Sequence, residues 1–91
     1  MKTYRVSHIL VTHKYEAEDL LLKIKEGSSF SELATKFSTC PSRERGGDLG
    51  PISFGKADPD FEDEALKLKI GEASGQPVRT KFGYHLILRL E

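Results

Sequence analysis

Residues 82–88 read FGYHLIL, and residues 6–11 near the other end of the chain read VSHILV. Both runs are rich in β-forming residues, so each predicts a β-strand with a histidine in its middle. The ends of a compact domain usually lie close together, and we therefore expect the two strands to pair and to bring His8 and His85 side by side. Cys40, the only cysteine, lies midway between them in a Pro/Gly-rich loop and is expected to complete one site.

Two helices, a turn-rich loop and a third helix are predicted between these strands. The first helix starts near Tyr15 and ends at Gly27, because the apolar residues repeat at helical spacing. Ser29 and Glu32 have the spacing of a capping box and start a second helix. A third begins at Asp58-Pro59, with a capping Asp and a proline at its first position. The phenylalanines at these helical spacings are expected in the core: Phe30, Phe37 and Phe61.

Short strands at residues 52–54 and 78–80 complete the order β-α-α-(loop)-β-α-β-β. The tight connection at residues 81–83 forces at least one antiparallel strand pair. This order predicts an α+β fold, with a small, mostly antiparallel sheet and helices packed around it. Ninety-one residues are enough for one domain, residues 1–91, with a single small core. Any active site is therefore expected to be a shallow groove.

Composition argues against several classes of partner. Fourteen basic and fourteen acidic residues cancel, and no basic cluster predicts nucleic-acid binding. The chain has no apolar run of membrane-spanning length and no signal-peptide pattern at its start. A lone cysteine agrees with a reducing compartment. We expect a cytoplasmic monomer with no membrane partner, or an extracytoplasmic domain if the chain is excised from a larger exported protein.

Three kinds of chemistry fit the two histidines and the thiol. A zinc site from His8, Cys40 and His85 has suitable ligands but lacks the short ligand spacing of structural zinc modules, and His13 points to the other side of the strand. A thiol hydrolase would use Cys40 with His85, oriented by Asp48. A groove for an extended peptide would instead use phenylalanines against an apolar side chain. The residues alone leave all three open.

Six motifs occur in one order along nearly the whole chain: residues 6–11 (VSHILV), 30–34 (FSELA), 40–42 (CPS), 46–50 (GGDLG), 61–62 (FE) and 82–87 (FGYHLI). Together they resemble the parvulin family of peptidyl-prolyl cis/trans isomerases. The resemblance implies a parvulin (FKBP-like) fold, a four-stranded antiparallel sheet surrounded by about four helices. It also implies isomerisation of Xaa-Pro bonds in unfolded or flexible polypeptides, without a metal or cofactor.

The resemblance also assigns roles to individual residues. His8 and His85 match the family's paired histidines, Thr80 the threonine linked to them, and Cys40 a position that holds Cys or Asp beside the reacting amide. The positions that match the proline pocket are Leu49, Phe61 and Phe82.

One position departs from the family pattern, because Ala57 stands where parvulins commonly have a methionine. We expect Ile52 or Phe54 to fill that gap, or catalysis to be weaker. The alternative is a chaperone module that binds proline segments with little turnover. A short connection before the first helix argues against phosphorylated targets, and Arg43 and Arg45 are candidates for selecting acidic residues.

Overall fold

The structure, a computed structural model, describes residues 3–91 and contains a four-stranded antiparallel sheet. Its strands are β1 (Thr3–Val11), β2 (Asp48–Ser53), β3 (Val78–Thr80) and β4 (Gly83–Arg89), in the spatial order β2-β1-β4-β3. The two terminal strands β1 and β4 are central neighbours, with His8 opposite Ile87 and Leu10 opposite His85. Directly opposed residues share a face, so both histidines lie on the same side of the sheet. The predicted pairing is confirmed.

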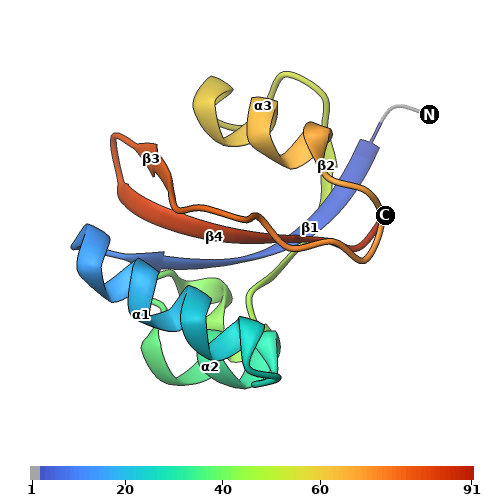
Figure 1. Cartoon of the computed structure of the whole chain (residues 1–91). Helices are drawn as coiled ribbons and strands as arrows, with labels where there is room; N and C mark the ends of the chain where they lie inside the picture. The colour runs from blue at the N-terminus through green and yellow to red at the C-terminus, as the bar shows by residue number, and fades with distance from the viewer. Residues whose placement is uncertain (1–2) are drawn as a thin grey trace.

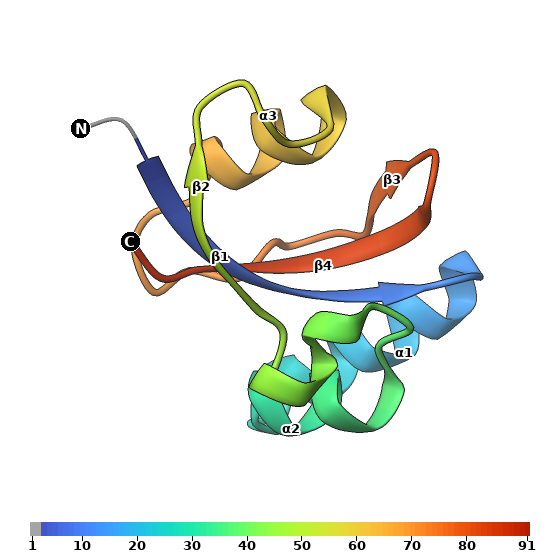
Figure 2. The same ribbon diagram turned by 180° about the vertical axis from the view of Figure 1, so that it is seen from behind.

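Helices cover both faces of the sheet (Figures 1 and 2). The helix α1 (Lys14–Lys25) and the helix α2 (Phe30–Phe37) lie against one face, and α3 (Pro59–Lys67) lies against the other. A short 3-10 helix, η1 (Pro41–Arg45), follows α2. The α+β class and the predicted order of elements are confirmed, and η1 is the fourth helical segment.

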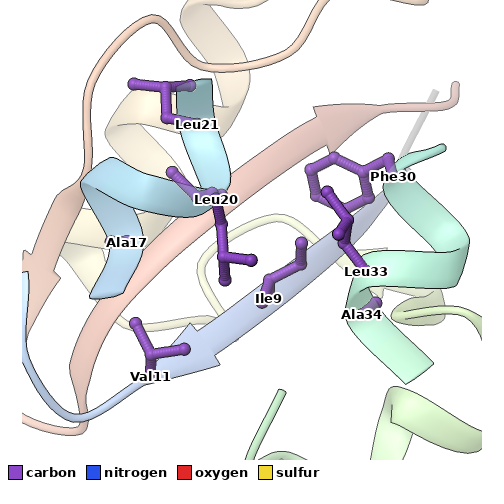
Figure 3. Close-up of a cluster of buried hydrophobic side chains, with 9 residues drawn as sticks. Ile9, Val11, Ala17, Leu20, Leu21, Phe30, Leu33 and Ala34 are labelled. Carbon is purple, nitrogen blue, oxygen red and sulfur yellow. The ribbon is translucent and has the colours of Figure 1, made fainter. Parts of the chain in front are cut away.

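Strand alternation divides the buried side chains between the two faces. Ile9 and Val11 of β1 point toward α1 and α2, where they meet a cluster that includes Leu20 and Phe30 (Figure 3). On the opposite face, Val6 and Ile87 pack against Phe61 of α3. The side of the sheet that carries His8 and His85 is therefore the α3 side.

The predicted helix starts are confirmed by their caps. The Ser29 hydroxyl accepts a hydrogen bond from the Glu32 backbone N–H at 3.4 Å, and Asp58 Oδ1 accepts one from the Asp60 N–H at 3.0 Å. The first helix begins one residue before Tyr15, with the His13 backbone N–H donating to Glu16 Oε1. Within residues 3–91, the helices fall short of the length and apolarity that crossing a membrane would require.

Three details of the prediction were wrong. The loop after α2 holds η1, and Cys40 is the residue directly before it, at the N-cap position. The strand expected at residues 52–54 starts at Asp48 and ends before Phe54, because pairing with β1 overrides the weak strand preference of its Gly and Pro. Phe37, expected in the core, is the last residue of α2 and is 47% exposed.

Candidate active site

His8 and His85 form a buried pair on the α3 side of the sheet. Their Nδ1 atoms are 2.9 Å apart, the rings are stacked with centroids 5.1 Å apart, and the residues are 5% and 4% exposed. Thr80, at the end of β3, places its Oγ1 2.7 Å from His85 Nε2 and accepts a hydrogen bond from the Phe82 backbone N–H. The turn between β3 and β4 thus fixes the orientation of the His85 ring.

Burial keeps both rings neutral at physiological pH. Removal from water is the main cause that lowers the pKa of His8 to about 4, and the neighbouring His85 contributes in the same direction. Burial likewise lowers the pKa of His85 to about 4, although the Asp58 carboxylate acts in the opposite direction. Because both rings are neutral, one Nδ1 must donate and the other accept.

Two tautomers of the pair make the same contacts. The Thr80 oxygen accepts from the Phe82 N–H, and with its second lone pair and its own hydrogen it can either accept from His85 Nε2–H or donate to His85 Nε2. Accordingly, either His8 Nδ1–H donates to His85 Nδ1, or His85 Nδ1–H donates to His8 Nδ1. In both cases His8 Nε2 is buried and has no partner within residues 3–91. The pair therefore leaves one unpaired ring nitrogen, on a ring that lines the adjoining groove.

The pair forms the floor of an apolar groove of about 380 Å³. Seven of the predicted site residues line it: His8, Cys40, Leu49, Ile52, Phe61, Phe82 and His85. Phe61 meets both histidine rings edge-on, at centroid distances of 5.6 Å for His8 and 5.1 Å for His85. A larger groove of about 520 Å³, between α3 and residues 74–79, contains none of these residues and is lined largely by charged and polar side chains. Of these two grooves, the smaller one combines His8, Cys40 and His85 with apolar walls, and the larger one does not.

Two predicted site residues lie outside the groove lining. Thr80 stands behind His85 and reaches the groove only through it. Phe54 is 52% exposed and packs edge-on against Tyr4, with ring centroids 5.5 Å apart. Of the two candidates expected to fill the space beside Ala57, Ile52 lines the groove and Phe54 does not.

The lining also contains residues that were not predicted: Leu10, Thr39, Pro41 and Asp58. Leu10 shares a strand face with His8, and Thr39 and Pro41 flank Cys40, so their neighbours in sequence were a usable signal. Asp58 was predicted only as a helix cap, so its place in the groove lining was not predicted.

The thiol lacks the partners that a hydrolase needs. Cys40 is partly buried, and its sulfur accepts a hydrogen bond from the Ser42 hydroxyl at 3.3 Å. Neither histidine hydrogen-bonds to it within residues 3–91: both ring nitrogens of His85 have other partners, and His8 Nε2 has none. Asp48, the predicted orienting residue, is paired with Arg5, whose hydrogen bonds lower the pKa of the Asp48 carboxyl.

A metal site is not assembled either. Among residues 3–91, no three His, Cys, Asp or Glu side chains are grouped as ligands. The arrangement is that of a peptide groove over a neutral polar floor, the third of the chemistries considered above.

Comparison with known proteins decides the family. Residues 8–91 match the model of the PPIC-type PPIase (rotamase) domain. The chain belongs to this family. The rotamase domain is 47% identical over 88 residues to the foldase protein PrsA of Bacillus subtilis, covering 96% of this chain and 30% of PrsA. It therefore spans about a third of the length of that curated relative.

Solved structures agree with the rotamase fold. PrsA from Bacillus anthracis superimposes with a TM-score of 0.94 at 43% identity, covering 98% of this chain and 41% of that one. NmPin, the parvuline of Nitrosopumilus maritimus, gives 0.85 at 38% identity, covering 100% and 98%. A chain from the SurA-like chaperones of Campylobacter jejuni, PEB4 and the periplasmic protein Cj1289, gives 0.91 at 36% identity, covering 98% and 38%. The predicted parvulin membership is confirmed, and the chain is a peptidyl-prolyl cis/trans isomerase domain.

Proposed function

We propose that this domain isomerises Xaa-Pro bonds in unfolded or flexible protein segments, with the proline ring held between Leu49, Phe61 and Phe82. The observation that carries the proposal is an apolar groove whose floor is a buried, neutral histidine pair. Proline-containing polypeptides are the proposed substrates. Residues 1–91 are proposed to act as a single isomerase domain, because both buried clusters share one sheet.

Rotation about the peptide bond requires no bond to break. The barrier of about 18–20 kcal/mol arises from resonance that keeps the C–N bond planar and charge-separated. Apolar walls would remove water from the amide and weaken the hydrogen bonds that favour the planar form. With its ring fixed in the groove, proline is the stationary end of the rotating bond.

The histidines and Cys40 are assigned supporting roles. Neutral His8 and His85 orient each other and set the polarity of the floor, with Thr80 as a positioning residue behind His85. Cys40 acts by size and polarity beside the amide instead of as a nucleophile, which agrees with its contact to Ser42 and not to a base.

A binding module with weak turnover is the second candidate. Ala57 leaves one wall of the groove short, and the curated relative carries the name foldase. A protease-coupled isomerase assay on an Ala-Pro peptide separates the two functions. Accelerated isomerisation supports the enzyme, whereas chemical-shift changes on peptide addition without acceleration support the module.

We also propose that the domain works outside the cytoplasm as part of a larger foldase. The cytoplasmic placement expected from the sequence gains no support from the comparisons. Two comparisons support an extracytoplasmic foldase instead. The chain spans 30% of PrsA, and one structural neighbour comes from SurA-like chaperones that include a periplasmic protein. Fractionation of cells that produce the natural full-length protein tests this placement.

A further inference from the structure

Asp58 carries the only carboxylate among the residues that line the groove, and no Lys or Arg lines it. Its side chain is half-buried, with Oδ1 held by the Asp60 backbone N–H at 3.0 Å. The other oxygen, Oδ2, makes no hydrogen bond within the described part of the chain. The effect of Asp58 on the pKa of His85 agrees with a carboxylate that faces the groove floor. Capping therefore uses one oxygen and leaves the other for a ligand.

The arginines expected near the groove are directed elsewhere. Arg43 Nε donates to the Thr35 backbone oxygen at 3.1 Å, and Arg45 Nε donates to the Asp48 backbone oxygen at 3.2 Å. Neither residue lines the groove, so the expectation that they select acidic substrates is not supported. Of the lysines adjacent in sequence to lining residues, Lys56 is exposed, and Lys81 places Nζ 5.3 Å from the Phe82 ring centroid. Asp58 is thus the charge that a bound segment meets inside the groove.

We propose that Asp58 makes the isomerase prefer substrates with lysine or arginine next to the proline, and reject acidic neighbours. This inference rests on the proposed function of the groove. Ala57 precedes Asp58 and ends that wall at a methyl group, which leaves room for the long methylene stem of a basic side chain. A half-exposed ion pair changes affinity by roughly two- to fivefold, and an acidic neighbour is repelled by a similar factor. We therefore expect about a tenfold difference between lysine and glutamate peptides.

The test uses one set of tetrapeptides that differ only before the proline, with Lys, Gln or Glu there, and a second set that differs only after it. For each peptide, an isomerase assay gives kcat/KM for cis/trans isomerisation, and a chemical-shift titration gives Kd for binding. The expected order is Lys above Gln above Glu in at least one set. Raising the salt concentration should reduce the Lys/Glu ratio, because the charges are near the surface.

Asp58→Asn and Asp63→Asn form a matched pair of variants. Asparagine caps a helix about as well as aspartate, so Asp58→Asn keeps α3 while removing the charge. The Lys/Glu ratio should fall to about one. Asp63→Asn removes the same charge from the same helix outside the groove lining and should leave the ratio unchanged.

The outcomes separate this inference from the proposed function. Absence of turnover with every peptide contradicts the isomerase function, and the Kd series then still measures the preference. Turnover without a lysine preference in either set overturns the role of Asp58 while the function stands. A preference that survives Asp58→Asn, or that disappears in Asp63→Asn, also overturns it.

Discussion

The Gly47 carbonyl accepts a hydrogen bond from the His8 backbone N–H at 2.9 Å, which joins the glycine loop directly to the strand that carries the histidine. A Cβ atom on Gly47 would lie 2.5 Å from the His8 carbonyl oxygen. Because η1 and Cys40 precede this contact in the chain, it sets the position of the thiol segment relative to the histidine pair. The motif GGDLG is therefore part of the architecture of the site.

Gly47→Ala should destabilise the fold. Its φ of +89° is unfavourable for alanine, and the new methyl group meets backbone that cannot move without disturbing β1. We expect the free energy of unfolding, measured by urea titration, to fall by more than about 1 kcal/mol. Gly27→Ala is the control, since Gly27 also has a positive φ, +104°, but has open space around it. Equal losses in the two variants would show that the contact with His8 contributes nothing.

Stability should fall as the solution becomes mildly acidic. The folded-state pKa of each buried histidine is about 4, below the unfolded value of about 6.5, so the unfolded chain binds more protons between these limits. Stability is full above pH 6.5 and declines toward pH 4, by about 1.4 kcal/mol for each unit of pKa difference in one group. Urea titrations across this range measure the decline. His13→Gln, at an exposed position, should retain it, and a flat profile in the wild type would contradict neutral burial of the pair.

Phe82→Ala should weaken peptide binding with little effect on stability. Phe82 is 62% exposed and lines the groove, so truncation changes the free energy of unfolding by less than about 0.5 kcal/mol. Loss of ~1 kcal/mol of apolar burial corresponds to about a fivefold rise in Kd. Isothermal titration with a proline peptide measures it. Phe54→Ala removes a ring that is 52% exposed but outside the groove lining, and should leave Kd unchanged. The reverse result would move the proline pocket to Phe54.

Thr80→Val should disturb the histidine pair. Valine has a similar shape but leaves His85 Nε2 without its partner in a buried site, at an expected loss of about 1–3 kcal/mol in stability. Turnover should fall as well, and the ring-nitrogen chemical shifts of His85 should change because Nε2 loses its hydrogen-bond partner. Thr80→Ser retains the hydroxyl and should restore the shifts. Unaltered shifts in Thr80→Val would remove Thr80 from the positioning role.

Local patterns predicted most of the fold because they are governed by local physics. The runs of β-forming residues around His8 and His85, and the caps at Ser29 and Asp58, each depend on a few neighbouring residues. The start of β2 at Asp48 escaped prediction because β1 supplies the pairing, which the sequence of β2 does not reveal. Phe37 has the right helical spacing but is the last residue of α2, and it remains 47% exposed.

Site membership was predictable for residues with distinctive chemistry and not for the rest. His8, Cys40 and His85 were identifiable as residue types that need an explanation, and the structure brings them to one groove. Ile52 and Phe54 would share a face of an extended strand, and they are separated only because β2 ends at Ser53, which no local pattern encodes. Asp58 was not predicted as a site residue, because its place before Pro59 was already explained by a helix cap. The structure shows that it also lines the groove.

Nuclear magnetic resonance exchange spectroscopy on an Ala-Pro peptide, with catalytic amounts of wild-type chain or Cys40→Asp, tests noncovalent isomerisation in this groove most directly. Uncatalysed exchange takes tens to hundreds of seconds, so catalysis appears as cis–trans exchange peaks on a much shorter timescale. We predict such peaks with both proteins, because the proposed role of the thiol depends on its size and polarity. Peptide binding without exchange in the wild type, or loss of exchange in a folded Cys40→Asp variant, would contradict the account.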